Sequence, residues 1–90
     1  MNITSEQLMN KLQTDLDPFY LSVEDESDQH AGHAGSDGSG QGTHFRVRIG
    51  TLGFTGLSRV ARHRLVYDAL QQFVDQGLHA LAIEIVEPPV

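Results

Sequence analysis

The sequence predicts a small α+β sandwich, in which a three-stranded mixed sheet carries two helices on one face. Three observations lead to this prediction. Apolar residues recur at helical spacing in two segments, and they alternate with polar residues in three others. The order along the chain is helix, strand, loop, strand, helix, strand. A length of 90 residues allows one domain, and we assign residues 1–90 to it.

The first helix is predicted to begin after Thr4 and to end at Asp17. Thr4 and Gln7 match a capping box, in which each side chain bonds the backbone amide of the other residue. Pro18 disfavours helical geometry at the residue before it. The apolar stripe of this helix comes from leucines spaced four residues apart: Leu8, Leu12 and Leu16.

Three segments alternate between apolar and polar residues, as half-buried strands do. Their inward-facing residues are Phe19, Leu21 and Val23, then Phe45, Val47 and Ile49, and finally Leu81, Ile83 and Ile85. Residues 44–50 and 80–86 should pair in parallel, because a crossover helix separates them. The first two strands should pair antiparallel. The open face of the sheet is expected to be wet, with Glu24 paired to an arginine on the next strand.

The second helix is predicted over residues 58–76, with Ser58 as its N-cap and Gly77 just past its end. Residues 50–56 are a turn region, and Phe54 is expected to plug the core. Residues 25–43 are predicted to form a mobile loop rich in glycine and histidine. Residues 27–42 contain no Val, Ile, Leu or aromatic residue.

Composition excludes several classes of function. The absence of cysteine excludes a disulfide scaffold, a thiol nucleophile and a thiolate metal site built from this chain alone. No apolar run approaches the ~18 residues that a membrane span needs, and the first residues lack the pattern of a secretory signal. No nucleophile elbow is present, so a serine hydrolase is not expected. We expect a cytoplasmic, monomeric protein that is not an enzyme and has no membrane partner.

Histidines are the candidate metal ligands. His30 and His33 lie three residues apart in the glycine-rich segment, His44 opens the second strand, and His79 opens the last strand. Imidazole binds zinc, copper, nickel and iron, and the spacing does not choose among them. Structural explanations compete with this hypothesis. The loop pair can be ordinary polar loop residues, and His79 can be a hydrogen-bonded histidine at the rim of the core.

Arginines form a second candidate site inside an acidic protein of net charge −6. All five charged residues within 46–64 are arginines, and a cluster occupies the first turns of the second helix: Arg59, Arg62, His63 and Arg64. The helix dipole disfavours cations there, which suggests an anionic or acidic partner. A pair between Arg64 and Asp68 is the competing structural explanation. We expect the three arginines to be exposed, and internal pairing of Arg62 would make its role structural.

Six segments together resemble the BolA family in order and spacing. They are Asp25-Glu26-Ser27, His30-Ala31-Gly32-His33-Ala34-Gly35, Thr43-His44-Phe45-Arg46-Val47, Phe54-Thr55-Gly56-Leu57-Ser58, Arg62-His63-Arg64-Leu65-Val66-Tyr67 and His79-Ala80-Leu81. The resemblance implies a KH-like type II fold without a working GxxG clamp. The segment Gly53-Phe54-Thr55-Gly56 is similar to that clamp in its glycines, but it follows a strand and lacks basic residues.

The resemblance also implies a role in iron–sulfur handling with a monothiol glutaredoxin. In such a pair, thiolates of the glutaredoxin and of glutathione hold a bridging [2Fe–2S] cluster. The BolA-like subunit adds a histidine at the position of His79 and a second ligand from the loop, here His30 or His33. The isolated chain is then expected to hold no cofactor. Clusters are held mainly by cysteine thiolates, so a chain without cysteine must share one.

An alternative that the resemblance implies is a transcriptional regulator that binds DNA through the arginine-rich helix 58–76. Binding to DNA would then depend steeply on salt concentration. The net charge of −6 favours the cluster adaptor, because the long-range field of an acidic protein repels phosphate.

Overall fold

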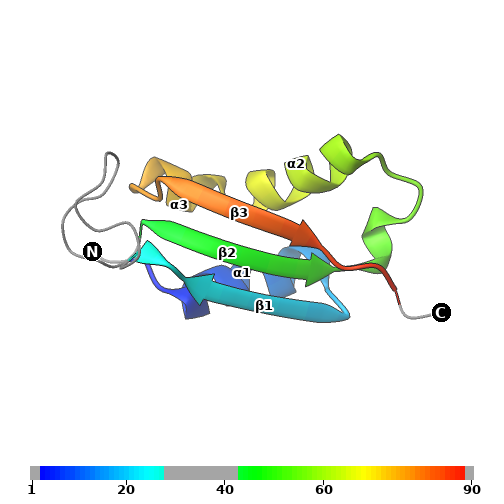
Figure 1. Cartoon of the computed structure of the whole chain (residues 1–90), viewed down its shortest axis with the longest axis horizontal. Coiled ribbons are helices and arrows are strands. Elements are labelled where there is room, and N and C mark those ends of the chain that lie inside the picture. The colour runs from blue at the N-terminus through cyan, green and yellow to red at the C-terminus, as the bar shows by residue number, and fades with distance from the viewer. Residues whose placement is uncertain (1–2, 28–42, 89–90) are drawn as a thin grey trace.

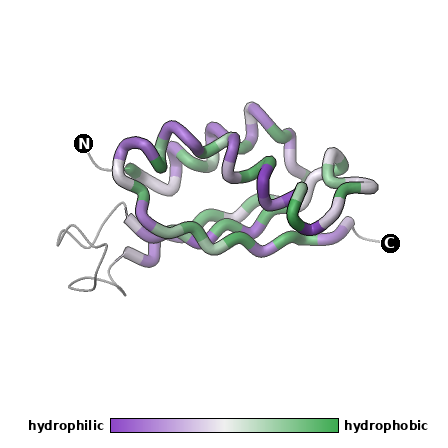
Figure 2. Tube along the Cα trace, turned by 90° about the horizontal axis from the view of Figure 1, so that it is seen from above, coloured by the Kyte–Doolittle hydropathy of each residue, from purple (hydrophilic) through white to green (hydrophobic). Residues whose placement is uncertain are grey.

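Two helical segments cover one face of a three-stranded sheet in the computed structural model, which describes residues 3–27 and 43–88 (Figure 1). The elements are α1 (Ser5–Leu16), β1 (Tyr20–Asp25), β2 (His44–Gly50), the short 3₁₀ helix η2 (Leu52–Phe54), α2 (Arg59–Ala69), α3 (Gln71–Asp75) and β3 (Ala80–Ile85). Helices and sheet form two separate layers (Figure 2). The predicted α+β sandwich is confirmed. In these described ranges, no helix is long and apolar enough to cross a membrane.

The sheet has the order β1-β2-β3. β1 pairs antiparallel with β2, and β2 pairs in parallel with β3. The parallel register runs from His44 opposite Ala80 to Ile49 opposite Ile85, which confirms the predicted pairing.

The open face of the sheet carries a network of ion pairs. Arg46 binds Glu26 at 2.9 Å and Glu84 at 2.6 Å. Arg48 binds Glu24 at 3.2 Å and Glu84 at 3.3 Å. The expected pairing of Glu24 with an arginine is therefore confirmed. The arginines of β2 are neutralised within the fold.

Glu84 should make the stability of the chain sensitive to acid. The hydrogen bond from Arg46, followed by the charge of Arg48, lowers the pKa of Glu84. A lowered carboxyl pKa stabilises the fold above the unfolded pKa, and this stabilisation disappears as pH falls through the folded pKa. We expect Glu84→Gln to lower the free energy of unfolding at neutral pH. The difference from the unmodified chain should shrink below about pH 4. Urea denaturation at a series of pH values measures it, and a difference independent of pH would contradict the prediction.

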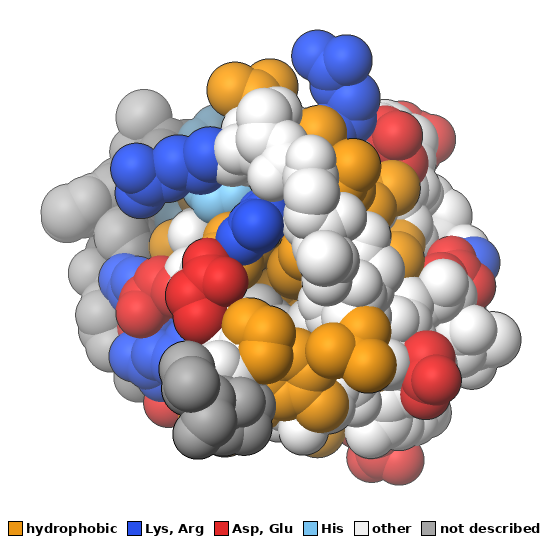
Figure 3. Space-filling model, turned by 90° about the vertical axis from the view of Figure 1, so that its right-hand side faces the viewer, with side chains coloured by type: hydrophobic (Ala, Val, Ile, Leu, Met, Phe, Trp, Pro, Cys, Tyr) orange, Lys and Arg blue, Asp and Glu red, His pale blue; other side chains and the backbone are white. Residues whose placement is uncertain are grey.

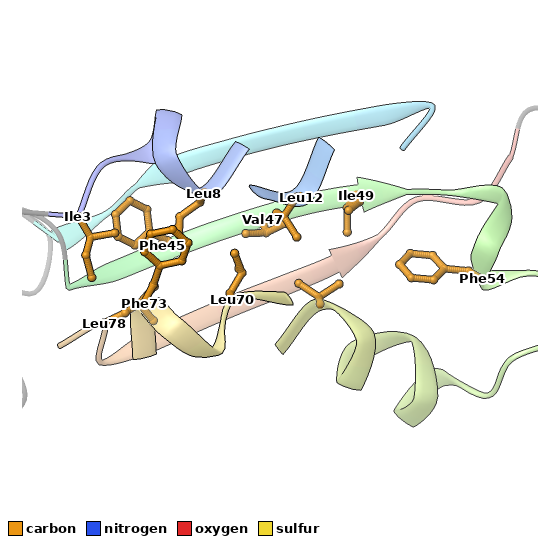
Figure 4. Packing of buried hydrophobic residues seen from close by; sticks show 11 residues of the cluster. Ile3, Leu8, Leu12, Phe45, Val47, Ile49, Phe54, Leu70, Phe73 and Leu78 are labelled. Carbon is orange, nitrogen blue, oxygen red and sulfur yellow. The ribbon is translucent and has the colours of Figure 1, made fainter. Parts of the chain in front are cut away.

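The core lies between the sheet and the helices (Figure 4). Phe45, Val47 and Ile49 of β2 are buried under both helical segments. Phe54 is also buried, so the residue does plug the core as predicted. The remaining members of the cluster are Ile3, Leu8, Leu12, Val66, Leu70, Phe73 and Leu78.

The second helix is interrupted at Leu70, so the single helix predicted over 58–76 is wrong. The N–H of Leu70 is shared between the carbonyls of Val66 and Tyr67, both at 3.1 Å, and the N–H of Phe73 bonds the carbonyl of Leu70 at 2.9 Å. Such i−3 bonds tighten the turn to about three residues. Leu70 and Phe73, on either side of this break, are both buried in the core. Gly77 follows α3 with a φ of 119°, as the predicted cap requires.

The predicted loop over 25–43 begins one residue too early, whereas its end at Thr43 agrees with the start of β2 at His44. β1 extends to Asp25, and the N–H of Glu26 bonds the carbonyl of His44 at 2.8 Å. Ser27 and Thr43 are buried. Residues 28–42, with His30 and His33, lie outside the described residues. The loop remains a prediction there.

Gly50 ends β2 at a position where no side chain fits. A Cβ there would lie 2.5 Å from the ring of Phe19 and 2.5 Å from the carbonyl oxygen of Val86. Phe19 precedes β1 and lies over Gly50; it is 41% exposed, contrary to its predicted inward position. We expect Gly50→Ala to lower the free energy of unfolding by about 2 kcal/mol.

Urea denaturation measures this effect, with Gly53→Ala as the control. A Cβ at Gly53 would meet its nearest atom only at 3.6 Å. The control should therefore change stability by less than about 0.5 kcal/mol. Equal effects of the two substitutions would show that crowding at Gly50 is unimportant.

Candidate metal centre at the start of β3

His79 stands at a rigid point of the fold with its side chain exposed. Its backbone N–H bonds the carbonyl of Thr43 at 2.8 Å, and the N–H of Ala80 bonds the same carbonyl at 3.1 Å. The preceding residue, Leu78, is buried in the core. The backbone is thus held on both sides of an imidazole that solvent reaches.

His44 lies beside His79. The two ring centroids are 5.3 Å apart, with the planes tilted by 56°. Nδ1 of His44 is 2.9 Å from Oγ1 of Thr43. His44 is only 7% exposed, although its alternation with the inward-facing residues of β2 predicts a position on the open, wet face of the sheet. The predicted parallel pairing of residues 44–50 with 80–86 contained the signal for this contact, since it places His44 next to Ala80.

The side chain of Ser27 joins the end of β1 to the start of β2, next to His44. Its hydroxyl oxygen accepts hydrogen bonds from the N–H groups of Thr43 at 2.8 Å and His44 at 2.9 Å. The same hydroxyl donates to the carbonyl of His44 at 3.3 Å. Ser27 is fully buried. We call Ser27, Thr43 and His44 the Ser27 clamp. It ties the end of β1 to the start of β2, and the Thr43 carbonyl extends the tie to His79.

The site offers an incomplete set of metal ligands. Across residues 3–27 and 43–88, no group of three or more His, Cys, Asp or Glu side chains could hold a metal ion. His79 presents an exposed imidazole, and the predicted second ligands, His30 and His33, lie outside these ranges. Imidazole suits iron, and in some clusters two imidazoles replace two thiolates on one iron. The exposed position of His79 can therefore serve a metal that another molecule also ligates.

The arginine cluster is smaller than predicted. Arg59 and Arg64 are exposed, but the side chain of Arg62 is only 20% exposed. Arg62 binds the carboxylate of Glu87 at 2.8 Å and the carbonyl of Leu57 at 3.1 Å. Its expected exposure is thus wrong, because the segment after β3 brings an acidic partner to it. The structure shows no ion pair between Arg64 and Asp68. His63 is half-buried.

The fold and the histidine pair define a small α+β protein with an exposed histidine at the start of its last strand. The family model for BolA-like proteins matches residues 12–89, and this chain belongs to that family.

Relatives and a solved structure agree with this assignment. The chain is 51% identical over 78 residues to the chloroplastic protein BOLA1 of Arabidopsis thaliana. The matched region covers 86% of this chain and 49% of that protein. The chain is also 51% identical over 85 residues to the SufE-like protein 1 of the same plant, covering 91% and 23% respectively. The chain thus spans about half the length of BOLA1 and about a quarter of the length of the SufE-like protein 1. The structure of Arabidopsis BolA1 superposes with a TM-score of 0.82 at 46% identity, covering 98% of this chain and 95% of that one.

Proposed function

We propose that this chain is an adaptor in iron–sulfur cluster handling. It binds a monothiol glutaredoxin and adds histidine ligands to a [2Fe–2S] cluster that the two proteins share. The observation that carries the proposal is the exposed imidazole of His79 on a backbone fixed by Thr43 and Leu78. A shared site needs one ligand whose position is set before the partner arrives.

The donor set of the chain fits a shared cluster. The sequence contains no cysteine, so the thiolates come from the glutaredoxin and from glutathione. His79 supplies the fixed imidazole, and His33 or His30 supplies the second one. Ligation by imidazole raises the reduction potential of such a cluster relative to ligation by thiolates alone. The proposed role is cluster binding and transfer, not catalysis.

Family membership supports the proposal. The BolA-like match covers most of the chain, and one relative is a SufE-like protein. The alternative, a regulator that binds DNA through α2, has less support. Arg62 is bound to Glu87, and Arg46 and Arg48 are bound to glutamates. Two exposed arginines on α2 remain, on a protein of net charge −6.

The proposal is tested by titrating a cluster-loaded monothiol glutaredoxin homodimer with the purified chain in the presence of glutathione. We expect the visible circular dichroism to change to a new spectrum that saturates at one chain per glutaredoxin. Omission of either protein should prevent the new spectrum. A spectrum that stays that of the homodimer would overturn the proposal. Salt-dependent binding of the chain to duplex DNA, without any spectral change, would favour the regulator instead.

A further inference from the structure

The outer edge of β3 carries a row of backbone groups that face away from the sheet. The N–H of Ala80 bonds the carbonyl of Thr43, and the N–H of Val86 bonds the carbonyl of Ile49. Backbone groups alternate in direction along a strand that pairs on one side. The even-numbered residues of β3 therefore face β2. The N–H and C=O groups of the odd-numbered residues face outward: Leu81, Ile83 and Ile85.

Tyr67 covers one end of this edge. Its hydroxyl donates a hydrogen bond to the carbonyl of Leu81 at 3.1 Å. In the described part of the chain, the backbone groups of Ile83 and Ile85 have no such partner on the outer side. An exposed row of this kind is a template for pairing with another strand.

A groove of about 480 Å³ runs beside this part of the edge, between β3 and the start of α2. Leu57, Ile83 and Ile85 give it apolar surface, while Arg59, Arg62 and His63 line it from the helix side. Figure 3 faces this end of the molecule and shows basic, histidine and acidic side chains grouped next to exposed hydrophobic ones.

The charges of the groove leave one cation without a partner. Arg62 is paired with Glu87. Glu84 is paired with Arg46 and Arg48 on the open face of the sheet. Arg59 is exposed and has no acidic partner among the described residues. The N-terminus of α2 adds partial positive charge at the same place. A carboxylate is the complementary group.

We propose that this groove binds an extended acidic peptide segment of a partner protein, which adds to β3 as a fourth strand. Its backbone pairs with Ile83 and Ile85, its apolar side chains contact Leu57, and its carboxylate binds Arg59. Strand addition of this kind draws affinity from backbone hydrogen bonds and specificity from the flanking side chains. The row of outward N–H and C=O groups favours a peptide over a nucleic acid, because only a peptide backbone offers the matching row of donors and acceptors.

The groove is separate from the metal centre. Ile85 follows His79 by six positions along the strand, which corresponds to about 20 Å. The inference therefore goes beyond the proposed cluster role and does not depend on it.

The test begins with selection of a random dodecapeptide phage library on the immobilised, full-length chain. The enriched peptides, made synthetically, are then measured by calorimetry and by amide hydrogen exchange. We expect them to combine alternating apolar residues with Asp or Glu, and to protect the amides of Ile83 and Ile85. Arg59→Glu should weaken binding at least about tenfold. The matched control is Arg64→Glu, the same charge change on an exposed residue of α2 outside the groove; it should weaken binding less than about twofold.

A second variant keeps the test decisive if Arg59→Glu fails to fold. Ile85→Pro removes one outward N–H, which edge strands tolerate, and it should also weaken binding. Three outcomes would overturn the proposal: no enriched peptide, protection confined to other amides, or single-stranded DNA replacing peptide as the Arg59-dependent ligand. His79→Ala should leave peptide binding unchanged, so failure here and failure of the cluster proposal are distinguishable.

Discussion

Replacing His79 by alanine is expected to abolish the circular dichroism spectrum of the cluster shared with a monothiol glutaredoxin, while the chain stays folded. The imidazole is exposed, so its removal takes little from the core. The backbone N–H that bonds Thr43 remains. We therefore expect the free energy of unfolding to change by less than about 0.5 kcal/mol. Visible circular dichroism measures the cluster, and urea denaturation measures the fold.

His63→Ala is the control for this experiment. His63 is a half-buried histidine on α2 that lines the groove beside the far end of β3, and its loss should leave the shared spectrum intact. Single substitutions of His30 or His33 should shift the spectrum or make the cluster more labile, because the other histidine can partly replace the lost one. A His79→Ala chain that forms the cluster with an unchanged spectrum would contradict the assignment.

Ser27→Ala is expected to lower the free energy of unfolding by about 3 kcal/mol. The substitution leaves the N–H groups of Thr43 and His44 without their acceptor, and each buried unsatisfied group costs about 1–3 kcal/mol. Urea denaturation measures the loss. The matched control is Ser22→Ala on the open face of the sheet, where we expect a change below about 0.5 kcal/mol. Similar values for the two serines would show that the Ser27 clamp is not a stabilising feature.

Most of the fold could be predicted because its signals are local. The capping box joins Thr4 and Gln7 within one turn, and both of its hydrogen bonds are present. Strand alternation identified the core-facing residues of β2, and the length of the crossover predicted its parallel pairing with β3. His79 stood out because a helix end and a strand start meet there. Apart from the strand pairing, which follows from the length of the crossover, each of these features depends on residues close together in the chain.

The features that were missed depend on contacts between distant segments. Arg62 looks like a surface cation until the segment after β3 brings Glu87 to it. His44 alternates with apolar residues, which predicts a wet position, but the ends of three strands converge around it. The break at Leu70 has no marker residue, because leucine is a good helix former. Leu70 is fully buried in the core, so the position of the break depends on contacts that the local sequence does not show.

The central position of β2 governs how fast this chain can fold. β2 pairs with β1, which precedes it, and with β3, which follows it, and neither pairing comes from a tight turn. Residues 26–43 must close before β1 and β2 meet, and residues 51–79 must close before β2 and β3 meet. Pairings between distant segments slow folding. Halving the segment between β1 and β2 lowers the entropy cost of closure by about 0.6 kcal/mol. If closure limits the rate, a chain shortened in this way would fold about threefold faster, as stopped-flow refolding would measure.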